Sequence, residues 1–266
     1  MGLTIANGLD EMSWETCESP RHLLRYLRTR TSELERWAVW FGMGGAETIS
    51  LKMRWVILAC CEQLAGPSPS RRVQRSLDLA EQYLETPLPT NIVERRKVIN
   101  QLNGGRGRAV SAIASALTSC SAAGLGMLRE ASACQAKARI ENKSEKETTF
   151  QAELITTARV QSDIIRDVFG NPFSPTQEIK NERREEVEHW LNRNDGTARK
   201  LVAAMEDEHH YDQIPILADA LEEAGCEDAD VLAHCRNGKI HVRGCWVMQL
   251  LQNTAMNYVE ENHESV

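Results

Sequence analysis

Apolar residues recur every three or four positions along most of this 266-residue chain, and the alternation typical of a half-buried strand is almost absent. Aromatic residues make up only 5% of the sequence, so a core must be built mainly from aliphatic side chains, which suit helices better than sheets. We therefore predict an all-α protein, with an N-terminal helical bundle of antiparallel hairpins followed by a compact C-terminal helical module.

Turn-forming residues divide this helical pattern into segments. Ser19-Pro20 predicts the start of one helix, and the cluster Gly66-Pro67-Ser68-Pro69 predicts the end of another that begins near residue 46. The segment Phe169-Gly-Asn-Pro-Phe-Ser-Pro175 combines a glycine C-cap with two prolines and predicts a sharper stop. We expect a helical bundle over residues 1–168, a turn over 169–175, and the C-terminal module over 176–266. Within the module the spacing predicts helices near residues 182–191, 195–208, 214–224, 228–236 and 244–260.

Three details of the bundle are also predicted from local signals. Gly124 and Gly126 predict a break in the helix, and the charged stretch over residues 141–147 predicts a turn within the helical pattern of residues 127–168. Cys60 and Cys61 are adjacent, and adjacent side chains on a helix point about 100° apart. We therefore expect at most one of the two thiols to face the core.

The charge is uneven along the chain, with a net +4 over residues 1–129 and a net −11 over residues 130–266. A net +4 is too weak to predict a surface that follows nucleic-acid phosphates, so nucleic acid is a minor alternative as a partner. The glycine-rich stretch over residues 103–108 lacks the Gly-Lys-Ser/Thr of a phosphate loop and is expected to be a connector. The basic residues available to that alternative are Arg71, Arg72, Arg75, Arg95, Arg96, Lys97, Arg106 and Arg108.

No basic segment followed by an apolar one opens the sequence, and the longest apolar run, residues 55–61, is too short to span a bilayer. We expect a cytoplasmic protein that does not associate with a membrane. In the reducing cytosol its eight cysteines would remain thiols.

A cluster of cysteine and histidine near the C-terminus is the main place where chemistry is expected. The pattern is Cys226-x7-His234-Cys235-x5-His241-x3-Cys245. These residues can supply the four ligands that zinc requires, although the paired Cys-x2-Cys spacing of common zinc sites is missing. Packing without a metal is the alternative, because buried cysteine behaves as a small apolar side chain.

A thiol nucleophile is a further alternative. Cys245 follows His241 by four residues and stands beside Arg243, and a helix beginning at Gly244 would lower the pKa of its thiol. The apolar residues after Cys245 predict a buried environment instead, in which a thiol is inert.

Two other groups of polar residues have structural explanations. His209-His210 is expected at a solvated helix end, and Asp219, Glu222 and Glu223 are expected on the polar face of an amphipathic helix. The motifs of α/β-hydrolases, dinucleotide-binding folds and P-loop proteins are missing.

Several unusual sequence motifs, in this order, resemble those of a family of bacterial proteins expanded in planctomycete genomes. The resemblance covers nearly the whole chain and identifies no reaction, ligand or catalytic residue. Its words are Trp14-Glu-Thr-Cys-Glu-Ser-Pro-Arg-His-Leu-Leu-Arg-Tyr-Leu27, Leu51-Lys-Met-Arg-Trp-Val-Ile-Leu-Ala-Cys-Cys61, Ile165-Arg-Asp-Val-Phe-Gly-Asn-Pro-Phe173, Asn194-Asp-Gly-Thr197, Leu217-Ala-Asp-Ala-Leu-Glu-Glu-Ala-Gly-Cys226, Leu232-Ala-His-Cys235 and His241-Val-Arg-Gly-Cys-Trp246.

The sequence therefore favours a non-enzymatic interaction or scaffolding module that binds another protein. One alternative is a metal- or thiol-dependent enzyme centred on Cys226–Cys245. The other is a nucleic-acid-associated factor that uses the basic N-terminal half.

Overall fold

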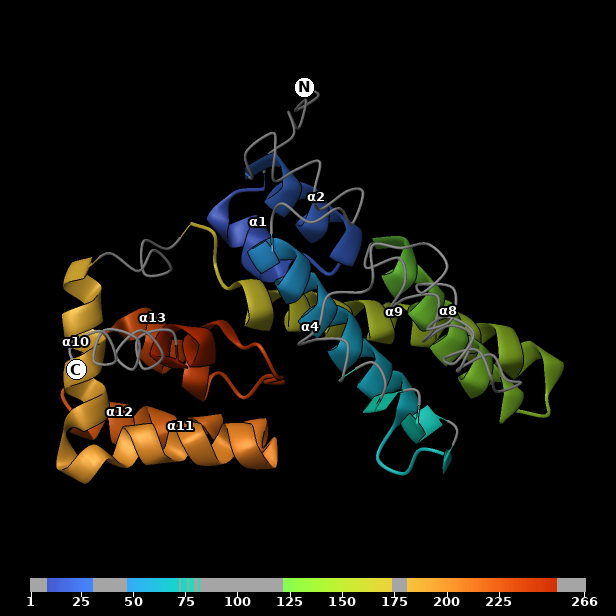
Figure 1. The fold of residues 1–266 in the computed structure, drawn as a ribbon. Coiled ribbons are helices and arrows are strands. Elements are labelled where there is room, and N and C mark those ends of the chain that lie inside the picture. Colours follow the sequence, from blue (N-terminus) through green and yellow to red (C-terminus); the bar gives the residue numbers. More distant parts are fainter. Residues whose placement is uncertain are drawn as a thin grey trace, which may run out of the picture. The chain divides into compact units, whose positions relative to one another are not determined.

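The structure is a computed structural model that describes residues 9–30, 47–71, 73–75, 77–78, 81, 122–173 and 181–252. Every regular element in these ranges is a helix, so the protein is all-α as predicted. Within the same ranges, no helix has both the length and the apolar character needed to cross a membrane. The chain forms two compact units, Met1–Ile165 and Arg166–Val266 (Figure 1).

Two helices of the first unit begin or end where the local sequence signals predict. Helix α2 begins at Pro20, with the Leu23 N–H donating to the Ser19 carbonyl at 3.2 Å. Helix α4 ends before Gly66, which adopts a φ of +70° and donates its N–H to Glu62. The helices of this unit are α1 (Glu11–Thr16), α2 (Pro20–Arg30), α4 (Glu47–Ala65), α8 (Ala122–Ala138) and most of α9 (Lys143–Phe169).

Helices α8 and α9 form an antiparallel hairpin. Lys137 pairs with Glu147 near the turn, Ser132 donates to Glu153 further along, and Gln161 reaches the carbonyl of Leu125. The predicted turn is present but lies slightly earlier, over residues 139–142.

The break predicted at Gly124 and Gly126 is wrong, because both residues lie inside α8. This helix packs against α2 and α4, and Gly124 is buried. Packing of this kind overrides the weak helix propensity of glycine, which costs only about 1 kcal/mol per residue.

The expectation that only one of Cys60 and Cys61 is buried is also wrong. Cys60 is 4% exposed and Cys61 0% exposed, and every residue from Val56 to Cys61 is buried. A buried run longer than one helical turn means that α4 is covered on all sides at its centre. The prediction assumed a single buried face.

The second unit contains the helices predicted for the C-terminal module. Trp190, Met205 and Ile214 are among the large side chains that are fully buried in its core. Residues of the last predicted helix beyond 252 lie outside the described ranges. The elements are α10 (Asn181–Asn192), η2 (Asn194–Gly196), α11 (Thr197–Glu208), η3 (Tyr211–Gln213), α12 (Ile214–Glu223), α13 (Ala229–Arg236) and a helical segment over residues 246–252.

Local signals again set the ends of these helices. Pro215 lies in the first turn of α12, and Gly225, with a φ of +92°, follows its end. The carboxylate of Asp228 accepts the N–H groups of Asp230 and Val231 and so caps α13.

The last turn of α9 belongs to the second unit, whereas the predicted boundary followed residue 168. Gly170 ends α9 with a φ of +71° and donates to the Arg166 carbonyl at 2.7 Å, as the glycine stop predicts. Asp167 and Val168, just before this stop, are held by side chains and backbone from residues 234–249. Long-range bonds of this kind are invisible to a boundary drawn from turn residues.

Some sequence predictions concern residues outside the described ranges. These include the glycine-rich connector over residues 103–108, and Arg72, Arg95, Arg96, Lys97, Arg106 and Arg108 of the basic set. Of that set, Arg71 and Arg75 are described, and both are exposed.

Two glycine substitutions should have opposite effects on stability. A Cβ added at Gly225 or at Gly126 would meet no atom within 4 Å, so the backbone conformation alone decides how each substitution changes the free energy of unfolding. Gly225→Ala places a side chain at a φ of +92° and should lower the free energy of unfolding by about 1 kcal/mol. Gly126→Ala lies within α8 and should raise it by about 0.5–1 kcal/mol. Urea unfolding of the two variants measures both changes, and a shared sign would contradict the described backbone.

Candidate metal site

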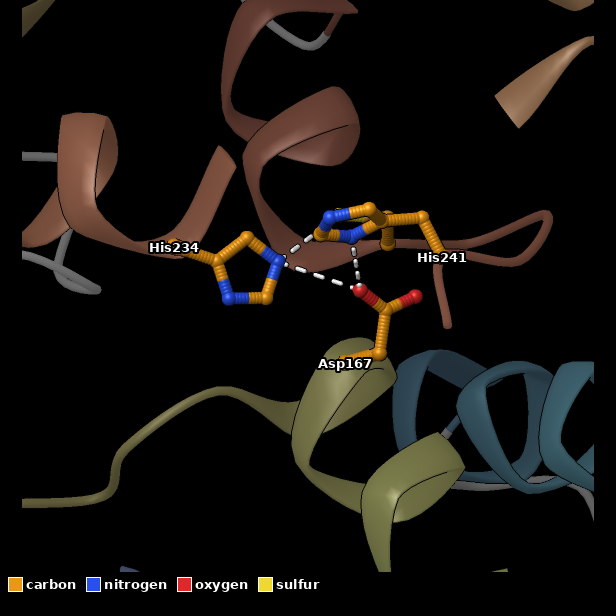
Figure 2. Close-up of side chains that lie close together, drawn as sticks. Asp167, His234 and His241 are labelled. Atoms are coloured by element: carbon orange, nitrogen blue, oxygen red, sulfur yellow. Dashed lines mark hydrogen bonds and ion pairs between the residues drawn. The ribbon is translucent and has the colours of Figure 1, made fainter. Parts of the chain in front are cut away.

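A buried carboxylate lies at the centre of a polar cluster in the second unit. Asp167, in the last turn of α9, is only 2% exposed. Its Oδ1 lies 2.7 Å from His241 Nδ1 and 3.1 Å from His234 Nε2, and its Oδ2 accepts the N–H of Val242 at 2.9 Å. Figure 2 shows both imidazole rings turned toward this carboxylate.

The two histidines come from neighbouring segments that follow each other in the chain. His234 lies in the last turn of α13, and His241 lies in the non-helical stretch after it. Their side chains are 12% and 3% exposed, so the cluster is shielded from water. The His234 ring packs edge-on against His241 and Trp246, with centroids 5.0 Å and 5.1 Å away. Packing on two sides fixes the direction of its Nε2 atom.

Cys245 completes the cluster. Its Sγ lies 3.2 Å from His234 Nε2, and the residue is fully buried. Cys245 directly precedes the helical segment 246–252, and its carbonyl accepts the N–H of Gln249. Backbone N–H groups of Met248 and Val247 also reach its sulfur, as they would in an N-cap.

Burial and the neighbouring charge of Asp167 raise the pKa of the Cys245 thiol well above its ordinary value. The N–H groups of Met248 and Val247 act in the opposite direction and offset only part of the shift. Without a cation in the cluster, Cys245 is therefore a protonated thiol.

The pKa of Asp167 is shifted in the opposite direction. Burial by itself raises the pKa of its carboxyl group, but hydrogen bonds and charges from His234 and His241 outweigh burial, and the net pKa is lowered. The carboxylate is therefore ionised at neutral pH, although it is buried.

The four side chains present a set of metal ligands with suitable separations. One ligand atom each from Asp167, His234, His241 and Cys245 lies within 4.8 Å of the others. Zinc bonds of about 2.0–2.3 Å in a tetrahedron place ligand atoms roughly 3.3–3.6 Å apart. The shortest distance between two ligand atoms in the cluster is 2.7 Å, and the longest is at most 4.8 Å. These values lie on either side of the zinc range, so small side-chain movements would bring the four atoms to tetrahedral positions.

One buried atom of the cluster has no partner. His241 Nε2 is inaccessible to solvent and makes no hydrogen bond, while the opposite nitrogen faces Asp167. A buried polar atom without a partner costs about 1–3 kcal/mol. An ion held beside Asp167 through Nδ1 would leave this nitrogen without a partner, so the orphaned atom does not bear on the metal assignment.

Of the five ligands considered from the sequence, three enter this cluster and two do not. His234, His241 and Cys245 are brought together, whereas Cys226 and Cys235 are 2% and 0% exposed within the apolar core. Cys235 follows His234 directly on α13, so its side chain points about 100° away. Burial, followed by the neighbouring Cys226, raises the pKa of Cys235 to about 12.

Asp167 was missed because its partners lie 67 and 74 residues away in the sequence. One local signal was available. Asp167 stands in the sequence among the apolar residues Ile164, Ile165, Val168 and Phe169, which places a carboxylate on the apolar part of the helix. A carboxylate placed on a buried stretch of helix requires a charged or hydrogen-bonding partner, which in itself marks a candidate site.

The other polar groups lie outside the cluster, as expected. His209 and His210 are exposed just after α11, where His209 adopts a φ of +57°. Asp219 and Glu222 are exposed on α12 and pair with Arg236 at 2.7 Å and 2.6 Å. These groups form a solvated helix end and a surface ion network.

The arrangement does not suit a thiol nucleophile. In a Cys-His-Asp relay the imidazole contacts the thiol with one nitrogen and the carboxylate with the other. Here His234 faces both Cys245 Sγ and Asp167 Oδ1 with the same atom, Nε2. Three groups that converge on one point can share an ion but cannot relay a proton along a line.

No family model, no curated protein and no solved structure matches this chain. Its function is therefore inferred from the geometry of its own residues.

Replacing the central carboxylate should destabilise the protein in a pH-dependent way. With a chelator present, Asp167→Asn should lower the free energy of unfolding at pH 7 by about 3 kcal/mol, because it removes one partner of a buried ionic cluster. The depressed pKa of Asp167 adds stability above the ordinary carboxyl pKa of about 3.9, and that stability is lost as the pH falls through the lower folded-state value. The difference in free energy of unfolding between wild type and variant should therefore become smaller below about pH 3.9.

Urea unfolding at a series of pH values measures this difference. A difference that stayed constant down to pH 2 would mean that Asp167 has no depressed pKa.

The Cys245 thiol should be unreactive in the native protein. Because it is buried and its pKa is raised, metal-free protein treated with iodoacetamide at neutral pH should label Cys245 at least about tenfold more slowly than the half-buried Cys134. Site-resolved mass spectrometry before and after unfolding measures the difference. Faster labelling of Cys245 in the native state would revive the nucleophile hypothesis.

Proposed function

We propose that the second unit is a metal-binding helical module in which Asp167, His234, His241 and Cys245 hold one zinc ion. The convergence of four ligand atoms within 4.8 Å of one another, in a buried cluster, supports this proposal most directly. The cluster includes three of the five ligands considered from the sequence and adds a carboxylate.

The donor set favours zinc among the common divalent metals. Imidazole nitrogen, thiolate sulfur and carboxylate oxygen are the three ligand types that zinc accepts in tetrahedral sites. Calcium and magnesium require mainly oxygen ligands, of which Asp167 supplies the only one here. The charge also fits, because Zn²⁺ together with one carboxylate and one thiolate gives a net charge of zero at a buried site.

The same ion would change the chemistry of Cys245. A bound cation opposes the charge of Asp167, which contributes to the raised pKa of the thiol. The N–H groups of Val247 and Met248 then support the thiolate as partners outside the coordination sphere. Loading should therefore release the proton of Cys245.

A structural role is more consistent with these ligands than a catalytic one. Four protein ligands complete a tetrahedral site, whereas catalytic zinc keeps one position open for water or substrate. The ion would join the end of α9 to residues 234–245, across separations of 67 and 74 residues. A cross-link across so long a loop restricts the unfolded chain and stabilises the folded one.

A closed structural site supports a non-enzymatic function, and we propose that the protein is a cytoplasmic interaction or scaffolding module that binds another protein. Cys60, Cys134, Cys235 and Cys245 are free thiols, in keeping with a reducing compartment. In this proposal the zinc ion maintains the shape of the second unit and takes no part in a reaction.

Metal analysis of the full-length protein tests the proposal. Purified protein dialysed against zinc and then against metal-free buffer should retain one zinc per chain. Cys245→Ala and His241→Ala should each weaken zinc binding by at least about 100-fold, since losing even an outer partner of a ligand costs 10–100-fold. Zinc at 1,000 times its Kd should add about 4 kcal/mol to the stability of the wild type.

Cys235→Ala is the matched control, because it removes a buried thiol from the same core without removing a ligand. This variant should retain one zinc per chain. If it loses zinc to the same extent as Cys245→Ala, or if wild type retains none, the four-residue site is wrong.

A further inference from the structure

A pocket of about 110 Å³ lies in the first unit, bordered by α4, α8 and α9. Leu64, Leu128 and Ile164 line it with apolar side chains, and all three are buried. Ser132, Glu153 and Gln161 add polar groups to the same lining. The pocket therefore combines an apolar wall with a few polar groups, as sites for small organic molecules do.

Gln161, one of the lining residues, leaves one hydrogen-bond acceptor unused. Its side chain is 1% exposed, and its Nε2 donates to the carbonyl of Leu125 on α8 at 2.9 Å. That bond fixes the orientation of the amide, because a flipped amide would bring two oxygens together. The other end, Oε1, is buried and has no partner.

Glu153 contributes a negative charge to the lining, and the described part of the chain places no cationic side chain against it. Its Oε1 accepts hydroxyl groups from Ser132 at 2.6 Å and from Thr157 at 3.3 Å. Within the described ranges, no lysine or arginine side chain forms an ion pair with it. Glu153 and Gln161 therefore each supply an acceptor to the lining, and that of Glu153 is charged.

The positions of Glu153 and Gln161 along α9 set the scale of a ligand that contacts both side chains. Glu153 and Gln161 are eight residues apart on α9, which corresponds to about 12 Å between their backbones along the helix axis. A single ammonium group is too small to bind both. The volume of about 110 Å³ is smaller than the cavity of roughly 150 Å³ that holds benzene, so about five non-hydrogen atoms fit.

We propose that this pocket binds a short aliphatic amine that carries a second hydrogen-bond donor. The ammonium group would bind the carboxylate of Glu153, and a hydroxyl or second amino group would donate to Gln161 Oε1. The short carbon chain between them would lie on Leu64, Leu128 and Ile164.

Three probes of equal size test this proposal by calorimetric titration of the full-length protein at neutral pH. They are 3-aminopropan-1-ol, butylamine, which lacks the second donor, and butan-1-ol, which lacks the ammonium group. We expect 3-aminopropan-1-ol to bind at one site per chain, and each of the other two to bind at least about tenfold more weakly. Equal binding of the three probes would mean that neither polar contact selects the ligand, and no binding of any probe would mean that the pocket holds only water; either result overturns the proposal.

Variants link the binding to the named residues. Glu153→Gln keeps the size of the side chain and one acceptor oxygen for Ser132 and Thr157 but removes the charge. It should weaken the binding of 3-aminopropan-1-ol at least about tenfold, without changing the affinity for butan-1-ol. Glu147→Gln is the matched control, since Glu147 lies on the same helix outside the pocket and pairs with Lys137. If both variants bind 3-aminopropan-1-ol equally well, the assignment of Glu153 is overturned. Circular dichroism establishes that the variants are folded.

Discussion

The buried carboxylate of Asp167 is the interaction on which the architecture of the second unit depends. An ionised group taken out of water loses solvation that must be replaced by partners, and Asp167 finds three of them in His234, His241 and the backbone of Val242. The partners lie in and after α13, whereas Asp167 lies in the last turn of α9. Satisfying one charge therefore fixes the positions of several segments at once.

The cluster around Asp167 has the ligands of a cation site. Atoms of Asp167, His234 and His241 converge with Cys245 Sγ, a thiol kept protonated by burial and by the charge of Asp167. A zinc ion would resolve these conflicts together, because it neutralises the carboxylate, accepts the thiolate and binds imidazole nitrogen. The pocket of the first unit is a different type of site from this cluster. Its carboxylate, Glu153, is half-buried and is not part of a closed set of metal ligands.

The helix ends could be predicted from the sequence because they depend on residues within one turn. The candidate site could be predicted only in part, because it depends on contacts between residues far apart in the chain. Pro20, Gly66, Gly170 and Gly225 act within one turn of their helix ends, and the sequence signals at these positions agree with the structure. By contrast, Gly124 and the pair Cys60-Cys61 were misjudged because neighbouring helices determine their burial. His234, His241 and Cys245 were recognised as candidates by their proximity in sequence, but Asp167 stands 67 residues before the first of them.

X-ray absorption spectroscopy of the zinc-loaded protein tests the central claim most directly, because it counts the atoms around the metal by type. The account predicts one sulfur at about 2.3 Å and three nitrogen or oxygen atoms at about 2.0–2.1 Å. Two or more sulfur neighbours would place the ion among Cys226, Cys235 and Cys245 instead. A shell without sulfur would exclude Cys245, and either result would contradict the assignment of Asp167, His234, His241 and Cys245 as the ligands.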